Sequence, residues 1–205
     1  MAIEFKQKHY AGHTPEFWRG EAKILPGGFK PTKDLPIGTV VRKATPVYVD
    51  FENLTAAIVK TAIVLAGGTT TKVRVPKGHY FAVGDMVAKN GDGAASPTIS
   101  SIDKSNSAYD VLNLSAGITG VKENDIIVES TEKTDTEAAK PLYVPNYVVG
   151  AEKVIDGKGL PTLDIAYEAV ILVPSLATPI LPEWLQEGGK YGCLKNNHNI
   201  IYIKQ

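Results

Sequence analysis

The segment FAVGDMVAKNGDG, residues 81–93, contains side chains that suit a calcium ion. Asp85, Asn90 and Asp92 carry oxygen ligands close to two glycines. A loop of the EF-hand type needs oxygen ligands at positions 1, 3 and 5, a glycine at position 6 and a bidentate glutamate at position 12. The chemistry to test first is therefore calcium binding.

The register of this segment against an EF-hand loop fails at two ligand positions. With Gly93 at position 6, Ala88 stands at position 1 and Ile99 at position 12, and neither side chain binds a cation. Asn90-Gly91 is instead a strong β-hairpin signal, because a type I′ turn needs a positive φ at both central residues. We therefore interpret residues 81–93 as a turn that folds one strand back on the next.

Two other pairs of residues have suggestive spacings but lack the groups that would complete a site. His9 and His13 have the i, i+4 spacing of zinc ligands on a helix, but a glycine between them and a proline after them disfavour that helix. Cys193 and His198 are a possible nucleophile and base for a hydrolase, but no orienting group or motif accompanies them. The sequence has no phosphate-binding glycine loop and no nucleophile elbow. We expect no enzyme activity, metal or cofactor.

The elements that would position these residues are strands. The 205 residues include 36 Val and Ile against 14 Leu, with 19 Gly and 13 Pro. Branched side chains lose rotamer freedom in helices and pack well on sheets, while Gly and Pro mark turns. The composition predicts an all-β fold. One short helical turn is expected at PEWLQEG, with Pro182 at its first position and Gly188 at its end.

The strand patterns divide into a core and an insertion. Residues 37–75 and 131–205 are predicted to build a β-sandwich or barrel core that closes with the apolar run Asn199–Ile203. Residues 54–68 fit a helical face as well as a strand, but their Ile, Val and Thr content favours strand. Between the two core parts, residues 76–130 show short strands at close spacing, which is typical of a small inserted β-barrel.

Residues 1–36 are predicted to form an extended N-terminal arm. Four prolines and four glycines are spread over this segment, so neither a helix nor a strand is expected to run far. The segment nevertheless carries five aromatic residues, which a disordered linker would lack. Such an arm needs a surface to lie on, either its own domain or a neighbouring subunit.

Charge and hydropathy bear on the partners. Lys and Arg together number 22, as do Asp and Glu, so the net charge is zero. A nucleic-acid-binding protein would show a basic excess, because phosphate contacts dominate its affinity. The longest aliphatic stretch, AVILV at 169–173, is far shorter than the ~20 residues of a membrane helix. We expect no nucleic-acid partner, no membrane partner and synthesis in a cytoplasm, and the single Cys193 allows no internal disulfide.

Two long stretches resemble the head-fibre or capsid-decoration proteins of tailed bacteriophages. They are PTKDLPIGTVVRKATPVYVDFENLTAAIVKTA (31–62) and SLATPILPEWLQEGGKYGCLKNNHNIIYIKQ (175–205). The pattern GDMV…ISSID…YDVLNLSAGITGVKENDIIV is similar to small barrels in such virion proteins. The resemblance implies a non-enzymatic protein on the outer capsid surface, made in the bacterial host cytoplasm. Its implied partners are the major capsid protein and further copies of itself, as a homotrimer.

Aromatic residues of the arm and apolar residues near the C-terminus are the expected partner contacts: Tyr10, Phe17, Trp18, Phe29, Trp184, Ile201 and Ile203. The alternative function is a carbohydrate or host-surface binding module. Trp18, Trp184 and Tyr191 would then stack on host-surface or mucus glycans, although Trp184 fits equally well as the apolar anchor of its own turn.

Overall fold

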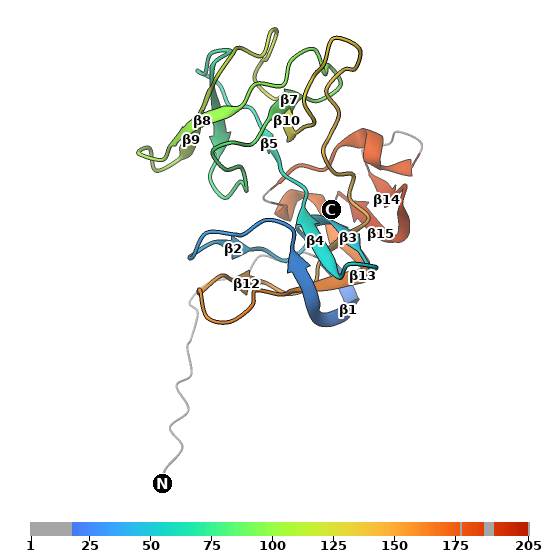
Figure 1. The fold of residues 1–205 in the computed structure, drawn as a ribbon. Coiled ribbons are helices and arrows are strands. Elements are labelled where there is room, and N and C mark those ends of the chain that lie inside the picture. Colours follow the sequence, from blue (N-terminus) through green and yellow to red (C-terminus); the bar gives the residue numbers. More distant parts are fainter. Residues whose placement is uncertain (1–17, 177, 187–190, 205) are drawn as a thin grey trace.

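The computed structural model describes residues 18–176, 178–186 and 191–204 (Figure 1). Strands make up 44% of the chain and helices 4%, which confirms the predicted all-β fold. The strands form two modules, a barrel in the lower part of Figure 1 and an insertion above it.

Five strands close into the barrel. Their order around the ring is β1 (Trp18–Pro31), β4 (Thr55–Ile58), β3 (Pro46–Asp50), β11 (Tyr147–Val149) and β13 (Leu163–Leu172), and β13 pairs with β1 to complete it. The strands are rich in Val, Ile and Ala, and their inward side chains fill the interior. The core residues inside include Phe29, Val47, Val49, Ala56, Val149, Leu163 and Ile165.

Strand β1 corrects the prediction that residues 1–36 form an arm without regular structure. It pairs antiparallel with β13 from Trp18 to Phe29, and then parallel with β4 at Lys30 and Pro31. This change of partner closes the barrel. Residues 1–17 lie outside the described residues.

The glycines expected to break β1 instead allow it to bend. Gly20, Gly27 and Gly28 have φ angles of 69°, 47° and 109°, and the pairing with β13 shifts register around them. Glycine reaches such angles without a steric penalty, and bulges re-aim a strand at barrel corners. The same residues that argued against a strand therefore make a curved one.

Strand β13 continues beyond the barrel into a small sheet. Its edge near Ile165 and Ala166 pairs with β11, and the same edge from Ala169 to Leu172 pairs with β15 (Asn197–Ile203). The last strand is followed outward by β14 (Gly192–Leu194). The C-terminal run is thus tied into the chain's own sheet.

Two 3₁₀ turns cover this sheet, η1 (Val173–Ser175) and η2 (Pro182–Trp184). Pro182 is the first residue of η2, as predicted. The N–H at the first helical position has no partner within the helix, so proline, which has no N–H, fits there. Gly188, the predicted end of the turn, lies outside the described residues. Trp184 from η2 is buried in the core cluster beneath, with Leu181, Leu185, Leu194, Ile200 and Tyr202.

The insertion contains two three-stranded sheets. One has the order β5 (Thr61–Ile63), β10 (Ile126–Glu129), β7 (Val87–Lys89), and the other β6 (Lys72–Pro76), β9 (Tyr109–Leu114), β8 (Ile99–Asp103). Backbone hydrogen bonds join them on both sides, from Leu65 N to Arg74 O (2.9 Å) and from Ile99 N to Asp85 O (2.8 Å). The insertion is therefore barrel-like.

The insertion begins earlier than predicted. Strands β5 and β6 lie in it, although residues 37–75 were assigned to the core. Apolar side chains in these strands, and Val64 just after β5, pack in the core of the insertion and not in that of the barrel. This core contains Ala62, Val64, Val73 and Val75 with Phe81, Ile99, Leu112 and Ile127. Alternating strand patterns show which residues are buried but not which of two cores buries them.

The turn at Asn90-Gly91 is real, but it is not the predicted type I′ hairpin. Asp92 N donates to Lys89 O (3.2 Å), and of the two central residues Gly91 alone has a positive φ, 76°. A single positive φ at the second central position is typical of a type II turn. Strand β7 has β10 as its ladder partner, but its start also meets the start of β8, through the antiparallel bridge of Met86 with Thr98 and a hydrogen bond from Val87 N to Pro97 O (3.0 Å). The chain therefore folds back as predicted, but through a longer connection than a two-residue hairpin.

A two-stranded ribbon, β2 (Val40–Val41) with β12 (Lys153–Val154), stands apart from the other sheets. In Figure 1 it projects at the left of the barrel, opposite β14 and β15. Val41 is buried, whereas Val40 and Val154 are exposed.

Candidate functional site

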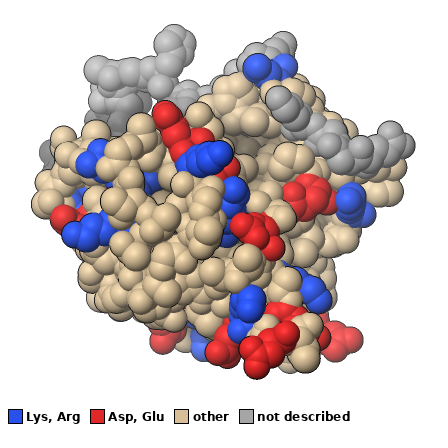
Figure 2. Space-filling view, turned by 90° about the horizontal axis from the view of Figure 1, so that it is seen from above, with Lys and Arg blue, Asp and Glu red and all other residues tan. Residues whose placement is uncertain are grey.

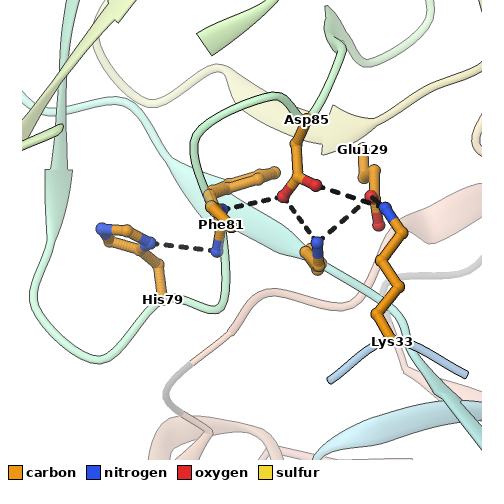
Figure 3. A network of polar contacts seen from close by, with 7 residues as sticks. Lys33, His79, Phe81, Asp85 and Glu129 are labelled. Carbon is orange, nitrogen blue, oxygen red and sulfur yellow. Dashed lines mark hydrogen bonds and ion pairs between the residues drawn. The ribbon is translucent and has the colours of Figure 1, made fainter. Parts of the chain in front are cut away.

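Four charged side chains meet where the barrel joins the insertion (Figure 3). Lys33 follows β1, Lys60 lies between β4 and β5, Asp85 precedes β7, and Glu129 ends β10. Lys60 Nζ lies 2.5 Å from Asp85 Oδ2 and 3.1 Å from Glu129 Oε1. Lys33 Nζ lies 2.6 Å from Glu129 Oε1 and 3.3 Å from Asp85 Oδ1. We call these four residues the junction cluster.

Three members of the junction cluster are buried. The side chains of Lys60, Asp85 and Glu129 are 8%, 5% and 4% exposed. Burial by itself would raise the pKa of Asp85, but hydrogen bonds from Lys60 and from the Ala82 N–H (2.8 Å) outweigh it and lower that pKa. Burial opposes the charge of Lys33 in the same way, but contacts with Glu129 and Asp85 raise its pKa.

The junction cluster is chemically self-satisfied. Its two cations and two anions cancel, and each carboxylate accepts hydrogen bonds from both lysines. A general acid or base needs a proton-transfer atom directed at a substrate, whereas these atoms are directed at one another. Because its members come from both modules, the cluster connects the insertion to the barrel.

A second polar group lies inside the insertion. His79 Nδ1 accepts a hydrogen bond from Phe81 N (3.1 Å), so the proton of the neutral ring is on Nε2, which faces Asp110 Oδ2 at 3.2 Å without hydrogen-bond geometry. Lys77 Nζ also bonds Asp110. Burial lowers the pKa of His79, against the opposing effect of Asp110. A histidine that acts as a general base needs one ring nitrogen directed at the nucleophile. Both ring nitrogens of His79 are instead directed at Phe81 N and Asp110 Oδ2.

The structure gives different positions to the predicted partner-contact residues. Phe29 and Trp184 are 5% and 3% exposed inside the chain's own cores, so they are not surface contacts. Trp18 is partly buried, and Lys43 Nζ lies 3.9 Å from its ring centroid. One ring face is therefore already covered by a cation.

Ile201 and Ile203 are the predicted C-terminal contacts. They belong to β15, which has β13 on one side and β14 on the other. Both edges of this strand are paired within the chain, so it cannot add to a partner's sheet. Tyr10 and Phe17 lie outside the described residues, as do His9 and His13.

The remaining candidates for chemistry are also separated. Cys193 donates its thiol hydrogen to Gln186 Oε1 (2.9 Å) and is paired across the hairpin with Ile201, not with His198. Asn90 donates to Glu183 Oε2 (3.1 Å), and Asp85 belongs to the junction cluster, so the possible calcium ligands point to different places. Among the described residues, no group of three or more His, Cys, Asp or Glu could hold a metal ion.

Sequence reasoning missed the junction cluster. One signal was present, because Lys60 interrupts the apolar run LTAAIVKTAIVL. A lone charge in a buried run is costly unless it is paired, so it predicts partners from elsewhere in the chain. Which carboxylates supply the pairing depends on the fold.

Comparisons with known proteins add no relative: no family model, no curated protein and no solved structure matches this chain. In the described part of the chain, no helix is long and apolar enough to cross a membrane.

Proposed function

We propose that this chain is a non-enzymatic structural protein of a tailed-bacteriophage virion. It lies on the outer capsid surface as a head-fibre or decoration protein, binds the major capsid protein and assembles as a homotrimer. The observation that carries the proposal is where the apolar and charged groups lie. Buried charges are used in internal contacts, whereas large aliphatic side chains remain exposed at the β2–β12 ribbon.

The surface charge supports an assembly role. The net charge is zero, and Figure 2 shows acidic and basic side chains intermixed on the face it draws. Copies of such a chain approach one another without long-range repulsion. The two stretches that resemble head-fibre proteins, residues 31–62 and 175–205, contribute strands to the barrel and its adjoining sheet.

Co-sedimentation with capsids tests the proposal. Capsids would be assembled from the major capsid protein encoded in the same genome and mixed with the purified chain. We expect the chain to sediment with them at a fixed stoichiometry, while an unrelated β protein of similar mass stays in solution. A chain that remains in the supernatant at high concentration would contradict the capsid role.

A second candidate function is glycan binding, and exposed rings on β3 and in the turn after it favour this function. Tyr48 is 41% exposed and stacks on Tyr143 with ring centroids 5.7 Å apart, and Phe51 is 48% exposed. Aromatic rings of this kind present flat apolar faces to sugars. Tyr191 is also exposed, but Trp184 is buried. A glycan array without hits would remove this candidate, and hits that survive Tyr48→Ala would exclude these rings as the site.

A further inference from the structure

Four aliphatic side chains are exposed together around the β2–β12 ribbon. Ile37, Val40, Val154 and Leu160 are 76%, 39%, 53% and 80% exposed. Val40 and Val154 are opposite each other in the ladder, and Ile37, Val154 and Leu160 line one hollow. We call these four residues the apolar end. Exposed apolar side chains that are contiguous mark an interaction surface, whereas isolated ones do not.

The loop that carries Leu160 is folded in a defined way. Asp156 Oδ1 accepts a hydrogen bond from Lys158 N (2.9 Å), and Gly157 and Gly159 both have a φ of 72°. A Cβ atom on Gly157 would lie 2.7 Å from Ile37 Cδ1, so Ile37 rests on the backbone of this loop. The local structure therefore supports the side chain of Ile37 from beneath, and a loop of defined backbone carries Leu160, so less conformational freedom is lost on contact.

The surroundings of the apolar end indicate what covers it. Among the described residues that line the hollow, the charged ones are Asp34, Asp156, Lys153 and Lys158, and none is aromatic. A lipid surface or nucleic acid would require a basic excess, and a sugar would favour aromatic rings. Two lysines and two aspartates around an aliphatic centre are complementary to the same arrangement on another copy.

We infer that the apolar end is the surface through which copies of this chain associate. The inference rests on the homo-oligomer of the proposed function and names its interface. Aliphatic side chains of different copies meet near the symmetry axis, and the lysines of one copy face the aspartates of another. This replaces the C-terminal strand as the contact, because both edges of β15 are occupied within the chain.

Sedimentation of surface variants tests the inference. Leu160→Asp places a charge in the centre of the apolar end, and Val83→Asp makes the same change at a residue that is 63% exposed in the insertion. We expect the wild-type chain and Val83→Asp to sediment as the same oligomer. We expect Leu160→Asp to be monomeric at that concentration, with at least a 100-fold weaker association and an unchanged circular dichroism spectrum.

Cross-linking gives a second measurement, which does not require a variant with weakened association. In a Cys193→Ser background, Leu160→Cys should form disulfide-linked copies on mild oxidation, while Val83→Cys should not. A mixture of Lys153→Glu/Lys158→Glu with Asp34→Lys/Asp156→Asn should associate more tightly than either variant alone. Asn at 156 keeps the side-chain oxygen that bonds Lys158 N.

The outcomes separate this inference from the proposed function. If the wild-type chain is an oligomer and Leu160→Asp remains one, the interface is wrong and the capsid role is untouched. If the wild-type chain is a monomer at high concentration, both the interface and the homotrimer are overturned, and capsid co-sedimentation still judges the capsid role. A monomeric Leu160→Asp that still sediments with capsids would support both.

Discussion

At the scale of single residues, Lys60 is a buried cation that depends on its ion-pair partners. Its side chain is 8% exposed and contacts two carboxylates that are themselves buried. Replacing a whole buried ion network by apolar groups is often neutral, but removing one partner leaves a buried charge uncompensated. The stability of the junction thus depends on the network being complete.

Lys60→Met should lower the free energy of unfolding by about 3–5 kcal/mol, because Asp85 and Glu129 would then share Lys33 alone. Urea denaturation followed by circular dichroism measures the change. Lys23→Met is the matched control, since the Lys23–Glu168 pair is exposed on both sides and should contribute little. Equal losses in both variants would contradict the role given to the junction cluster.

Asp85 should make stability depend on pH in the acid range. Its pKa in the folded chain lies below the ordinary value of 3.8, so the unfolded state binds more protons. The stabilisation is present above the ordinary pKa and is lost as the pH falls through the lower, folded value. Unfolding free energies from pH 6 down to pH 2 should fall less steeply for Asp85→Asn than for the wild-type chain. Parallel curves would show that Asp85 does not contribute.

Tyr202 presents the opposite case, a buried polar atom to which no described residue forms a hydrogen bond. The side chain is fully buried, and burial raises the pKa of its hydroxyl. Tyr202→Phe removes this hydroxyl and should leave the free energy of unfolding unchanged or raise it by up to about 1 kcal/mol. Thermal melts of the variant and the wild-type chain measure the change.

Tyr80→Phe is the control for that change. The Tyr80 hydroxyl accepts from Arg42 N (3.0 Å) and lies 3.1 Å from Thr45 Oγ1, so its loss should destabilise the chain by about 1–2 kcal/mol. A clear loss of stability in Tyr202→Phe would mean that its hydroxyl has a partner, such as an ordered water.

At the scale of elements, β1 is the strand on which closure of the barrel depends. Its bends use glycines at different positive φ angles, 69° at Gly20 and 109° at Gly28. An angle near +69° is in the left-handed region that other residues occupy at some cost, whereas +109° is accessible almost to glycine alone. Replacement by a residue with a side chain should therefore be less costly at Gly20 than at Gly28.

Gly28→Ala should cost about 1–3 kcal/mol from backbone strain, and Gly20→Ala less. A Cβ atom at either position would meet nothing within 4 Å, so crowding does not confuse the comparison. Thermal melts of the two variants provide the measurement. A larger loss at Gly20 than at Gly28 would contradict the strained bend assigned to β1.

At the scale of the whole molecule, the barrel and the insertion have separate cores but share several contacts. The junction cluster joins them, Thr61 Oγ1 donates to Pro179 O (2.6 Å), and Asn90 donates to Glu183. Val128 of β10 also packs in the core that contains Trp184. These contacts link elements far apart in sequence.

Because of these contacts, scanning calorimetry of the wild-type chain should show one cooperative transition. Lys60→Met should broaden or split it, since the insertion then loses part of its attachment to the barrel. Two resolved transitions in the wild-type chain would show that the modules unfold independently. Lys23→Met serves again as the control and should keep a single transition.

The sequence by itself determined the properties that depend on local chemistry. Branched side chains and frequent turn residues predicted an all-β chain, and Pro182 predicted the short helical turn, because both follow from backbone preferences of the residues concerned. The tertiary structure alone decided which elements pair. Glycine-rich β1 became a barrel strand, β5 and β6 joined the core of the insertion, and Asn90-Gly91 became a turn within a longer connection between β7 and β8.

The candidate site divides in the same way. Trp184 was expected from the sequence to fit as an apolar anchor, whereas the signal of a buried charge that Lys60 gives in its apolar run was missed. The identity of the partners Asp85 and Glu129, and the exposure of Ile37 and Leu160, came from the fold. The physical reason is that burial and pairing are set by residues distant along the chain, whereas propensity is set by neighbours.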